Sequence, residues 1–204
     1  MATIHIHPDN PQARLVKQVI ETFRAGGILV YPTDSGYALG CGLGNKSGTE
    51  RIRRLRQLNK VHPFTLLCRD LSEIAVYARI TNPVFRFLKA HTPGPYTFIL
   101  SATRVVPRQL QHPKRKTIGI RVPDHRVIQA ILEQLQEPLM NVTLIFPGEQ
   151  WAPSEISERE QELTTQVDLI VNSGVCGVEP TTVINLVDGK PTILREGKGD
   201  ISDM

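Results

Sequence analysis

The chain has 204 residues, of which 40% are hydrophobic and 22% are charged, with 24 Lys and Arg against 20 Asp and Glu. This balance is typical of a soluble globular protein and excludes a disordered, collagen-like or coiled-coil chain. No apolar run approaches the roughly 18 residues that a transmembrane helix needs, and residues 1–5 do not resemble a secretory signal. The cysteines are three, an odd number, and lie far apart. We therefore expect a cytoplasmic protein in a reducing compartment, without disulfides and without a membrane partner.

Short apolar strands alternate with amphipathic helices along the whole chain, which predicts an α/β fold. Strands are expected at 3–6, 28–31, 64–68, 96–100, 117–122, 138–145, 167–172, 182–187 and 192–195. Helices are expected from Asn10 to about residue 25, from Ser47 to Leu58, after Ser72, and at 82–89, 124–135 and 154–163. We predict Asn10, Ser47 and Asp124 as N-caps because their side chains can accept from the first free amides of a helix. The Asp188-Gly189 turn between the last two strands predicts a hairpin, so the sheet should be mixed rather than purely parallel.

Positive charge is concentrated in the first part of the chain. Residues 1–145 hold 20 Lys and Arg against 9 Asp and Glu, whereas residues 146–204 hold 4 against 11. Two clusters stand out, one of Arg51, Arg53, Arg54, Arg56 and Lys60, and one of Lys114, Arg115 and Lys116. Such asymmetry indicates a polyanionic partner, either nucleotide phosphates or RNA. The alternative for each cluster alone is a solvated surface with scattered ion pairs.

Several familiar catalytic motifs are absent. The chain has no phosphate-binding P-loop, no dinucleotide-binding glycine motif after a strand and no nucleophile elbow. Its six histidines lack metal-ligand spacing with the cysteines, so no protein metal site is expected. Cys41 and Cys68 are predicted to fill the core. A metalloenzyme, an oxidoreductase or a hydrolase with a covalent nucleophile therefore has little support.

The segment from Tyr31 to Cys41 follows a predicted buried strand and begins with Pro32, hydroxyl residues and glycine. Ligand-binding loops of α/β proteins lie at this end of a strand. Thr33 and Ser35 are thus candidate donors to an anionic ligand. The alternative is a turn that these hydroxyls stabilise.

This segment resembles the opening motif of the YrdC/YciO family, and further resemblances follow in order along about residues 10–197. They are Pro93-Gly94-Pro95-Tyr96-Thr97, Gly119 to His125, Val167 to Ile170, Pro180 to Ile184, and Leu194-Arg195-Glu196-Gly197. The resemblance implies the YrdC-like fold, a twisted mixed parallel and antiparallel sheet flanked by helices, formed by residues 1–204 as a single domain. It also implies a basic concave cavity.

The best-known members of this family are threonylcarbamoyl-AMP synthases. They convert L-threonine, bicarbonate and ATP, with Mg²⁺, into threonylcarbamoyl-AMP and pyrophosphate, and the product feeds threonylcarbamoyladenosine formation in tRNA. The chemistry needs positioned cations around a triphosphate and no covalent nucleophile, in keeping with the absence of a nucleophile motif.

Residue roles carried over by position are expectations of the resemblance. Thr33, Arg121, Thr143 and Thr181 would bind the amino-acid substrate, and Arg56 and Arg121 would be catalytic. The nucleotide would be bound by Arg56, Lys60, Thr181, Thr182 and Arg195. Structural ion pairs are the alternative for Arg121 and Arg195.

With two departures from the synthase pattern, the chain resembles the YciO branch of the family. The Lys-x-Arg element is Arg56-Gln57-Leu58 here, so one cation is replaced by an apolar side chain. The Ser-x-Asn element is Thr143-Leu144-Ile145, which keeps the hydroxyl and loses the amide. Such losses indicate a changed ligand or a reduced activity, and Lys60 or His62 are the candidates for compensation. The alternatives are a protein that binds tRNA or double-stranded RNA through a basic concave face, and a catalytically inactive relative that binds a nucleotide.

Overall fold

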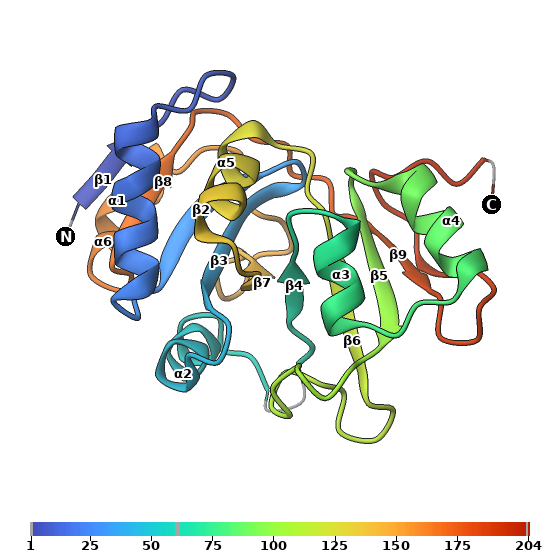
Figure 1. Ribbon diagram of the computed structural model, residues 1–204. Helices are drawn as coiled ribbons and strands as arrows, with labels where there is room; N and C mark the ends of the chain where they lie inside the picture. The colour runs from blue at the N-terminus through green and yellow to red at the C-terminus, as the bar shows by residue number, and fades with distance from the viewer. Residues whose placement is uncertain (1, 60–61, 203) are drawn as a thin grey trace.

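The computed structural model contains a ten-stranded sheet with helices packed along it (Figure 1). It describes residues 2–59, 62–202 and 204. The strands are β1 (Ala2–His5), β2 (Leu29–Thr33), β3 (Gly36–Gly42), β4 (Thr65–Leu67), β5 (Tyr96–Ser101), β6 (Thr117–Arg121), β7 (Leu139–Thr143), β8 (Leu169–Asn172), β9 (Thr182–Asn185) and β10 (Thr192–Arg195). The helices are α1 (Ala13–Arg24), α2 (Lys46–Leu55), α3 (Leu71–Tyr77), α4 (Asn82–His91), α5 (Arg126–Leu135), the short 3₁₀ helix η1 (Ser157–Arg159) and α6 (Glu160–Thr164).

The strand order is β1-β8-β2-β3-β7-β4-β6-β5-β9-β10. The pairs β1–β8, β2–β8, β4–β6 and β5–β9 are parallel, and the other neighbours are antiparallel. The predicted mixed sheet of an α/β fold is therefore confirmed, including the antiparallel pairing of β9 with β10.

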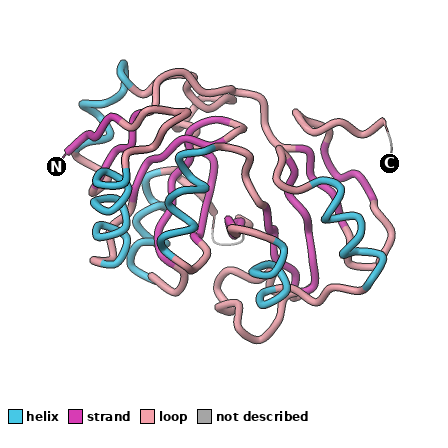
Figure 2. Tube along the Cα trace, turned by 45° about the horizontal axis from the view of Figure 1, so that its top comes forward, coloured by secondary structure: helices cyan, strands magenta, loops and turns pink. Residues whose placement is uncertain are grey.

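One face of this sheet is covered over its first half and open over its second. The strand register places one row of residues on this face: Leu29, Gly40, Asn141, Thr65, Gly119 and Ile99. At the β2 end, α1 and α5 cover this face, and Leu29 and Tyr31 pack with Val16 and Ile131. Toward β4, β6 and β5 the same face carries small and polar residues and opens into a cavity. Apolar residues of α2, α3 and α4 belong to the core on the opposite face, and Figure 2 shows α4 on the outer side of the C-terminal strands.

The predicted ligand loop at residues 31–41 is instead a β-hairpin. Pro32 lies inside β2 and pairs with Tyr37 of β3. A proline is tolerated there because the ladder between β2 and β8 ends at Val30, so no neighbour needs its missing amide. Only Asp34 and Ser35 lie between the two strands. Residues 36–42 were missed as a strand because their glycines suggest a loop, whereas pairing with β7 fixes them as a strand.

The helix starts differ from the predicted N-caps. Asn45, not Ser47, caps α2, since its Oδ1 accepts from the Gly48 amide at 2.8 Å. His125, not Asp124, caps α5 by accepting from the Val127 amide at 3.3 Å. The helix expected from Asn10 begins at Ala13, without a side-chain cap.

The helix expected at 154–163 is also shorter than predicted. It consists of η1 followed by the five residues of α6. Its acidic residues give it little apolar surface to pack, and Leu163 is its buried residue.

Cys41 and Cys68 are buried and unpaired, as expected. Burial raises the pKa of Cys41 to about 12 and the pKa of Cys68 well above its ordinary value. Both thiols therefore stay protonated at neutral pH and act as core side chains. Among the described residues, no helix combines the length and the apolar character that crossing a membrane requires.

Candidate functional site

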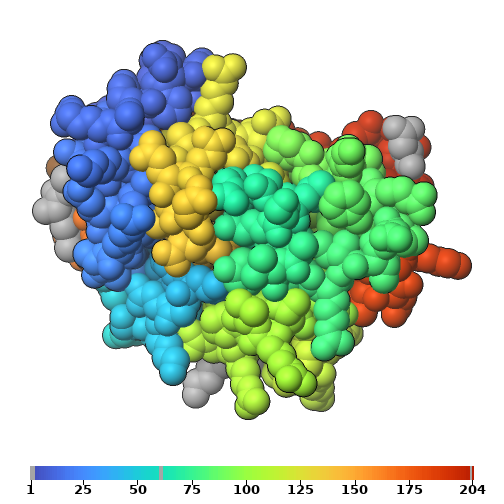
Figure 3. All heavy atoms as spheres, viewed as in Figure 1, coloured from blue at the N-terminus to red at the C-terminus, as the bar shows by residue number. Residues whose placement is uncertain are grey.

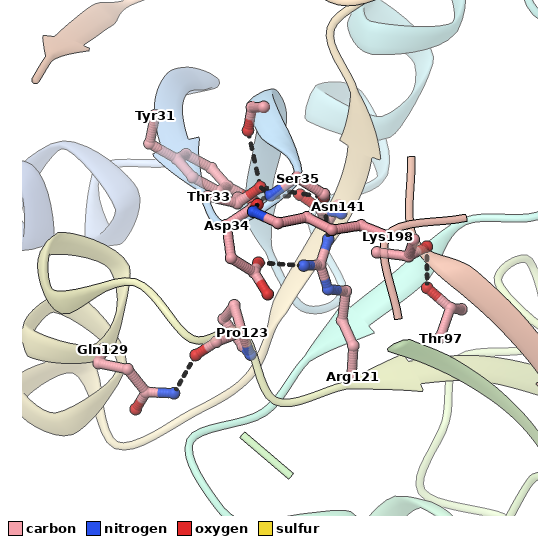
Figure 4. A network of polar contacts seen from close by, with 12 residues as sticks. Tyr31, Thr33, Asp34, Ser35, Thr97, Arg121, Pro123, Gln129, Asn141 and Lys198 are labelled. Carbon is pink, nitrogen blue, oxygen red and sulfur yellow. Dashed lines mark hydrogen bonds and ion pairs between the residues drawn. The ribbon is translucent and has the colours of Figure 1, made fainter. Parts of the chain in front are cut away.

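The guanidinium group of Arg121 joins the end of β6 to the turn of the β2–β3 hairpin (Figure 4). Its Nη1 donates to Ser35 Oγ at 2.9 Å, and its Nη2 forms an ion pair with Asp34 Oδ1. Both charged side chains are almost completely buried, 5% and 6% exposed. Lys198 Nζ donates to the Asp34 carbonyl at 2.6 Å and is a further contact that holds the turn.

This ion pair is not saturated. Asp34 Oδ2 and Arg121 Nε are buried and have no hydrogen-bond partner among the described residues. Buried polar atoms without partners are rare, and each is costly to maintain. The folded chain therefore leaves one carboxylate oxygen and one guanidinium N–H of this ion pair without a hydrogen bond among the described residues.

Thr33 lies beside this pair but is occupied by the turn itself. Its Oγ1 donates to the Gly36 carbonyl at 2.7 Å and accepts from the Ser35 amide at 3.2 Å. The side chain is 1% exposed and does not line the cavity. In this structure the Thr33 hydroxyl therefore stabilises the hairpin turn, the alternative that its sequence context left open, and its contact with a substrate stays a prediction.

A cavity of about 250 Å³ lies on the open face of the sheet. It brings together five of the predicted site residues, Arg56, Arg121, Thr143, Thr181 and Arg195. The other lining residues are His62, Pro63, Phe64, Thr65, Thr97, Ile99, Gly119, Asn141, Val142, Ile145 and Val183. No Asp or Glu is among them, so three guanidinium groups face a space without a lining carboxylate.

Arg56 reaches the cavity from the end of α2. Its Nε donates to the Thr143 carbonyl at 2.8 Å, and its Nη1 donates to the Ile145 carbonyl. These bonds hold the guanidinium at the end of β7, and burial lowers its pKa from the ordinary value. Among the described residues it makes no ion pair, so its charge is not neutralised by a protein carboxylate.

Arg195 enters from β10 and is fixed on Thr181. Its Nη2 donates to the Thr181 carbonyl at 2.8 Å and to Thr181 Oγ1 at 3.2 Å. Thr181 Oγ1 also lies 2.8 Å from Thr97 Oγ1. In the described part of the chain Arg195 likewise lacks a carboxylate partner.

Thr182, a predicted nucleotide contact, does not line the cavity. Thr182 is fully buried, and its Oγ1 donates to the Gly199 carbonyl at 2.7 Å and accepts from the Gly197 amide at 3.0 Å. Its side chain faces away from the cavity because successive residues of a strand alternate, and its neighbours Thr181 and Val183 line it. Lys60 lies outside the described residues.

The two departures from the synthase pattern have different surroundings. Ile145 lines the cavity, whereas Leu58 packs against the apolar core and does not line it. His62, one of the two candidates for compensation, does line the cavity. Burial and then the charges of Arg56 and Arg53 lower the pKa of His62, so its imidazole is neutral near pH 7.

Asn141 is a cavity residue that the sequence analysis missed. It is 4% exposed, and its Oδ1 accepts from the buried Tyr31 hydroxyl at 2.9 Å. The acceptor side of the amide is thereby fixed, which turns the Nδ2 donor away from Tyr31. Asn141 lies two residues before Thr143 on β7 and therefore on the same face of the strand. That alternation was the signal available in the sequence.

The first basic cluster of the sequence is not a free patch. Arg51 pairs with Asp168 at 2.6 Å. Arg53 is 9% exposed, lies over the Phe64 ring and pairs with Glu50 at 3.5 Å. The ion pairs agree with the alternative of a surface with scattered ion pairs, although Arg53 is buried and not solvated. Of the described members of the cluster, only Arg56 lines the cavity.

Comparison with known proteins gives close and distant relatives. The chain is 53% identical to the Escherichia coli K12 protein named uncharacterized protein YciO, over 97% of this chain and 96% of that protein. The crystal structure of E. coli YciO has a TM-score of 0.93 and covers 98% of each chain at 52% identity.

More distant relatives are named as threonylcarbamoyl-AMP synthases. The putative threonylcarbamoyl-AMP synthase of Methanocaldococcus jannaschii is 27% identical over 95% of this chain and 92% of its own. The human threonylcarbamoyl-AMP synthase is 26% identical over 89% of this chain and 67% of its own. The structure of P. abyssi Sua5 complexed with L-threonine shares the fold, with a TM-score of 0.87 at 22% identity over 97% of this chain and 58% of that one.

A family relationship follows from the matched length as well as from these relatives. The sequence model of the Sua5/YciO/YrdC family, described as telomere recombination, matches residues 21–197. The hairpin turn, the Arg121 strand end and the Arg195 strand end all fall inside that range. The chain belongs to the Sua5/YciO/YrdC family.

Proposed function

We propose that this protein is an ATP-dependent nucleotidyltransferase that forms threonylcarbamoyl-AMP or a closely related acyl adenylate. The observation that carries this proposal is the set of guanidinium groups of Arg56, Arg121 and Arg195 around a cavity without a lining carboxylate. Such a set suits a ligand that brings several negative charges of its own. The distant relatives named as threonylcarbamoyl-AMP synthases support the choice of reaction.

The amino acid would bind at the Arg121 end of the cavity. Its carboxylate would accept from the Arg121 guanidinium, which lines the cavity. Thr143 and Asn141 lie on β7, which pairs with β3 of the hairpin, and add a hydroxyl and an amide donor. L-Threonine fits this set because it presents a carboxylate, an amine and a hydroxyl within one small molecule.

The nucleotide would extend from Arg195 toward a second hollow. This hollow has a volume of about 390 Å³ and shares Ile99 with the cavity. Val187 and Leu194 give it apolar surface that suits a base, whereas Thr181 and Arg195 would meet the phosphates.

No group of three or more metal-ligating side chains occurs in the described residues. The lining residues therefore do not fit a resident Mg²⁺. The ion would arrive coordinated by the triphosphate, in keeping with its preference for phosphate and water oxygens.

The chemistry would need charge and positioning from the protein. The amine of the amino acid and bicarbonate would condense to a carbamate with loss of water, and a carbamate oxygen would attack the α-phosphorus of ATP. The bond from that phosphorus to the β-phosphate bridging oxygen breaks, and pyrophosphate leaves with the electron pair. Arg56 and Arg195 would stabilise the negative charge on the transferring and leaving groups. With Leu58 and Ile145 in place of a cation and an amide, we expect a lower rate than in the synthases.

The test is release of pyrophosphate from ATP, Mg²⁺ and bicarbonate, with and without L-threonine. A known synthase is the positive control, and Leu58→Arg and Arg195→Gln are assayed in parallel. We expect threonine-dependent release, faster release from Leu58→Arg, and about ten- to hundredfold weaker ATP binding by Arg195→Gln because a charged hydrogen-bond donor is lost.

Unchanged ATP affinity in Arg195→Gln would contradict the assigned site. Release by Leu58→Arg but not by the natural chain would point to another acyl acceptor in the same cavity. If neither the natural chain nor Leu58→Arg releases pyrophosphate while the known synthase does, the proposed reaction is overturned. A nucleotide-binding relative without activity would then be favoured.

A further inference from the structure

Asn141 presents an amide donor on the floor of the cavity. Its Oδ1 accepts from the Tyr31 hydroxyl at 2.9 Å, whereas its Nδ2 makes no hydrogen bond with a described residue. The side chain is buried and lines the cavity. A side-chain amide has two N–H donors besides its acceptor oxygen, so both N–H groups of Asn141 are unused within the described chain.

The buried phenol of Tyr31 decides which way this amide points. Tyr31 is fully buried, and its ring packs edge-on against Phe23 of α1 at a centroid distance of 6.1 Å. The blue atoms of α1 and the gold atoms of α5 form a continuous surface over this part of the molecule (Figure 3). If the amide were flipped, the Tyr31 hydroxyl would face an N–H group and lose its acceptor, which is costly for a buried donor. The donor side of Asn141 is therefore the side that the ligand meets.

A glycine allows the phenol to reach the amide. Tyr31 lies on β2 and Asn141 on β7, and β3 lies between these two strands. Gly40 of β3 pairs with Asn141, and a Cβ at Gly40 would collide with the Tyr31 hydroxyl. The phenol thus passes over a position without a side chain. The direction of the Asn141 donor is set before any ligand binds.

The amide lies between two of the cavity arginines along the direction of the strands. On one side of Asn141, Leu139 is level with Arg121 through β4, which pairs with both β6 and β7. On the other side, the Thr143 carbonyl accepts from Arg56 at 2.8 Å. Two residues of a strand span about 7 Å. Asn141 is therefore about one small chemical group away from the level of each arginine.

This position faces the group that joins the two ends of the ligand. In the proposed reaction the carboxylate of the amino acid lies at Arg121, and Arg56 stabilises the transferring phosphate. The carbamate lies between them. One of its oxygens attacks the phosphorus, and the other can accept a hydrogen bond from Asn141 Nδ2. A free amino acid has no acceptor oxygen at this place, because its nitrogen carries only hydrogens.

We propose that Asn141 binds the carbonyl oxygen of the acyl group on the nitrogen of the amino acid, and so selects an N-carboxylated or N-acylated amino acid over the free one. Tyr31 is a positioning residue for this contact. The role rests on the proposed function, and it belongs to a residue that the family pattern did not name.

The test is isothermal titration with two ligands, N-acetyl-L-threonine and L-threonine. The first ligand carries a carbonyl where the carbamate would lie, and the second does not. We expect Asn141→Leu to bind N-acetyl-L-threonine about tenfold more weakly than the natural chain does, because a hydrogen-bond donor is lost. Its affinity for L-threonine should stay within about twofold.

Two further variants separate ligand binding from packing. Tyr31→Phe/Asn141→Leu removes both partners of the buried hydrogen bond, so thermal stability should recover while the loss of N-acetyl-L-threonine affinity remains. Asn172→Leu is the matched control. Asn172 Oδ1 also accepts from a buried tyrosine, Tyr37, at 3.4 Å, but Asn172 does not line the cavity. This control should change the affinity for either ligand by less than about twofold.

Three results would overturn this role of Asn141. Equal losses for both ligands in Asn141→Leu would place the amide on the amino acid itself. Recovery of N-acetyl-L-threonine affinity in the double variant would leave Asn141 a role in packing alone. A natural chain that binds neither ligand would remove the basis for the contact.

Pyrophosphate release tests the proposed reaction separately. Release without a difference between the two ligands in Asn141→Leu would contradict only the role of Asn141. That difference without release from the natural chain would contradict only the reaction.

Discussion

The guanidinium groups of the cavity and the cations of a surface hollow at the connection between β5 and β6 carry the same sign of charge but are held in opposite ways. In the cavity, Arg121 is bonded to Asp34 and Ser35, and Arg195 is bonded to Thr181. In the hollow, the side chains of Arg104 and Arg108 are exposed and have no carboxylate partner among the described residues.

The difference separates two kinds of cationic region. Fixed donors lose little entropy when a small ligand binds, and they set its orientation, which is what a reaction needs. Exposed arginines keep their side-chain freedom, and ordering them on a ligand costs entropy. The variants below change one region and leave the other intact.

The largest effect is expected for Arg121→Gln. This change leaves the Asp34 carboxylate buried without its ion-pair partner, which should cost about 3–5 kcal/mol of unfolding free energy. Urea unfolding measures it. The matched control is Asp34→Asn/Arg121→Gln, which removes both charges and should recover part of the loss. A double variant no more stable than the single one would show that the pair does not have this electrostatic role.

A smaller loss is expected for Asn141→Leu. The Tyr31 hydroxyl is buried, burial raises its pKa, and it would lose its acceptor. A buried donor without a partner costs about 1–3 kcal/mol, whereas replacement of both partners by apolar groups is nearly neutral. Thermal unfolding should therefore show Tyr31→Phe/Asn141→Leu closer to the natural chain than Asn141→Leu alone. Additive losses would indicate that the Tyr31–Asn141 bond contributes little.

Gly119→Val should affect ligand binding without removing a charge. A Cβ at Gly119 would lie 3.2 Å from Thr65 Oγ1 and 3.4 Å from Thr97 Cγ2, so a larger side chain would occupy the cavity floor. We expect ATP affinity to fall about tenfold, or about 1.4 kcal/mol. Arg104→Gln/Arg108→Gln in the hollow should leave ATP affinity unchanged. Isothermal titration with ATP measures both values. An equal loss in both variants would join the two regions into one site.

The smallest effect concerns His62 and pH. The pKa of His62 is lowered in the folded chain, so its contribution to stability decreases as pH falls below about 6.5, where the unfolded chain takes up the proton. An anion in the cavity raises this pKa, and binding then takes up a proton. Pyrophosphate affinity should therefore rise about threefold more between about pH 8 and pH 6 in the natural chain than in His62→Gln. Parallel pH profiles for the two proteins would contradict this assignment.

Much of the fold could be predicted from local pattern. Apolar runs such as 28–31 and 117–122 predicted strands, and Val127, Ile128 and Ile131 predicted the buried face of α5. The hairpin strand β3 was not predicted, because Gly36 and Gly40 weaken the strand pattern in the sequence. Its conformation depends on pairing with β7. The N-caps of α2 and α5 were predicted wrongly, because at each helix start two nearby residues have side chains that could cap the helix. The backbone path of the folded chain decides which of the two does so.

The roles of the named site residues stay predictions, but the structure shows which of these residues lie together. Arg56, Arg121, Thr143, Thr181 and Arg195 were named from their positions in the family pattern, and the structure places all five around one cavity. Thr33 and Thr182 were named on the same basis, but their hydroxyls bond to neighbouring backbone groups. A residue type and its place in a motif do not reveal which partner the folded chain will offer it.

The sequence by itself determined the α/β alternation, the buried strands, the family and the concentration of basic residues before residue 146, because these depend on local periodicity and on composition. Only the tertiary structure decided which cations are free. Arg51 meets Asp168, a residue 117 positions away, whereas Arg104 and Arg108 meet no carboxylate in the described chain. The reason is physical: a charge is neutralised by whatever lies within a few ångströms in space, and that distance is set by the packing of the sheet.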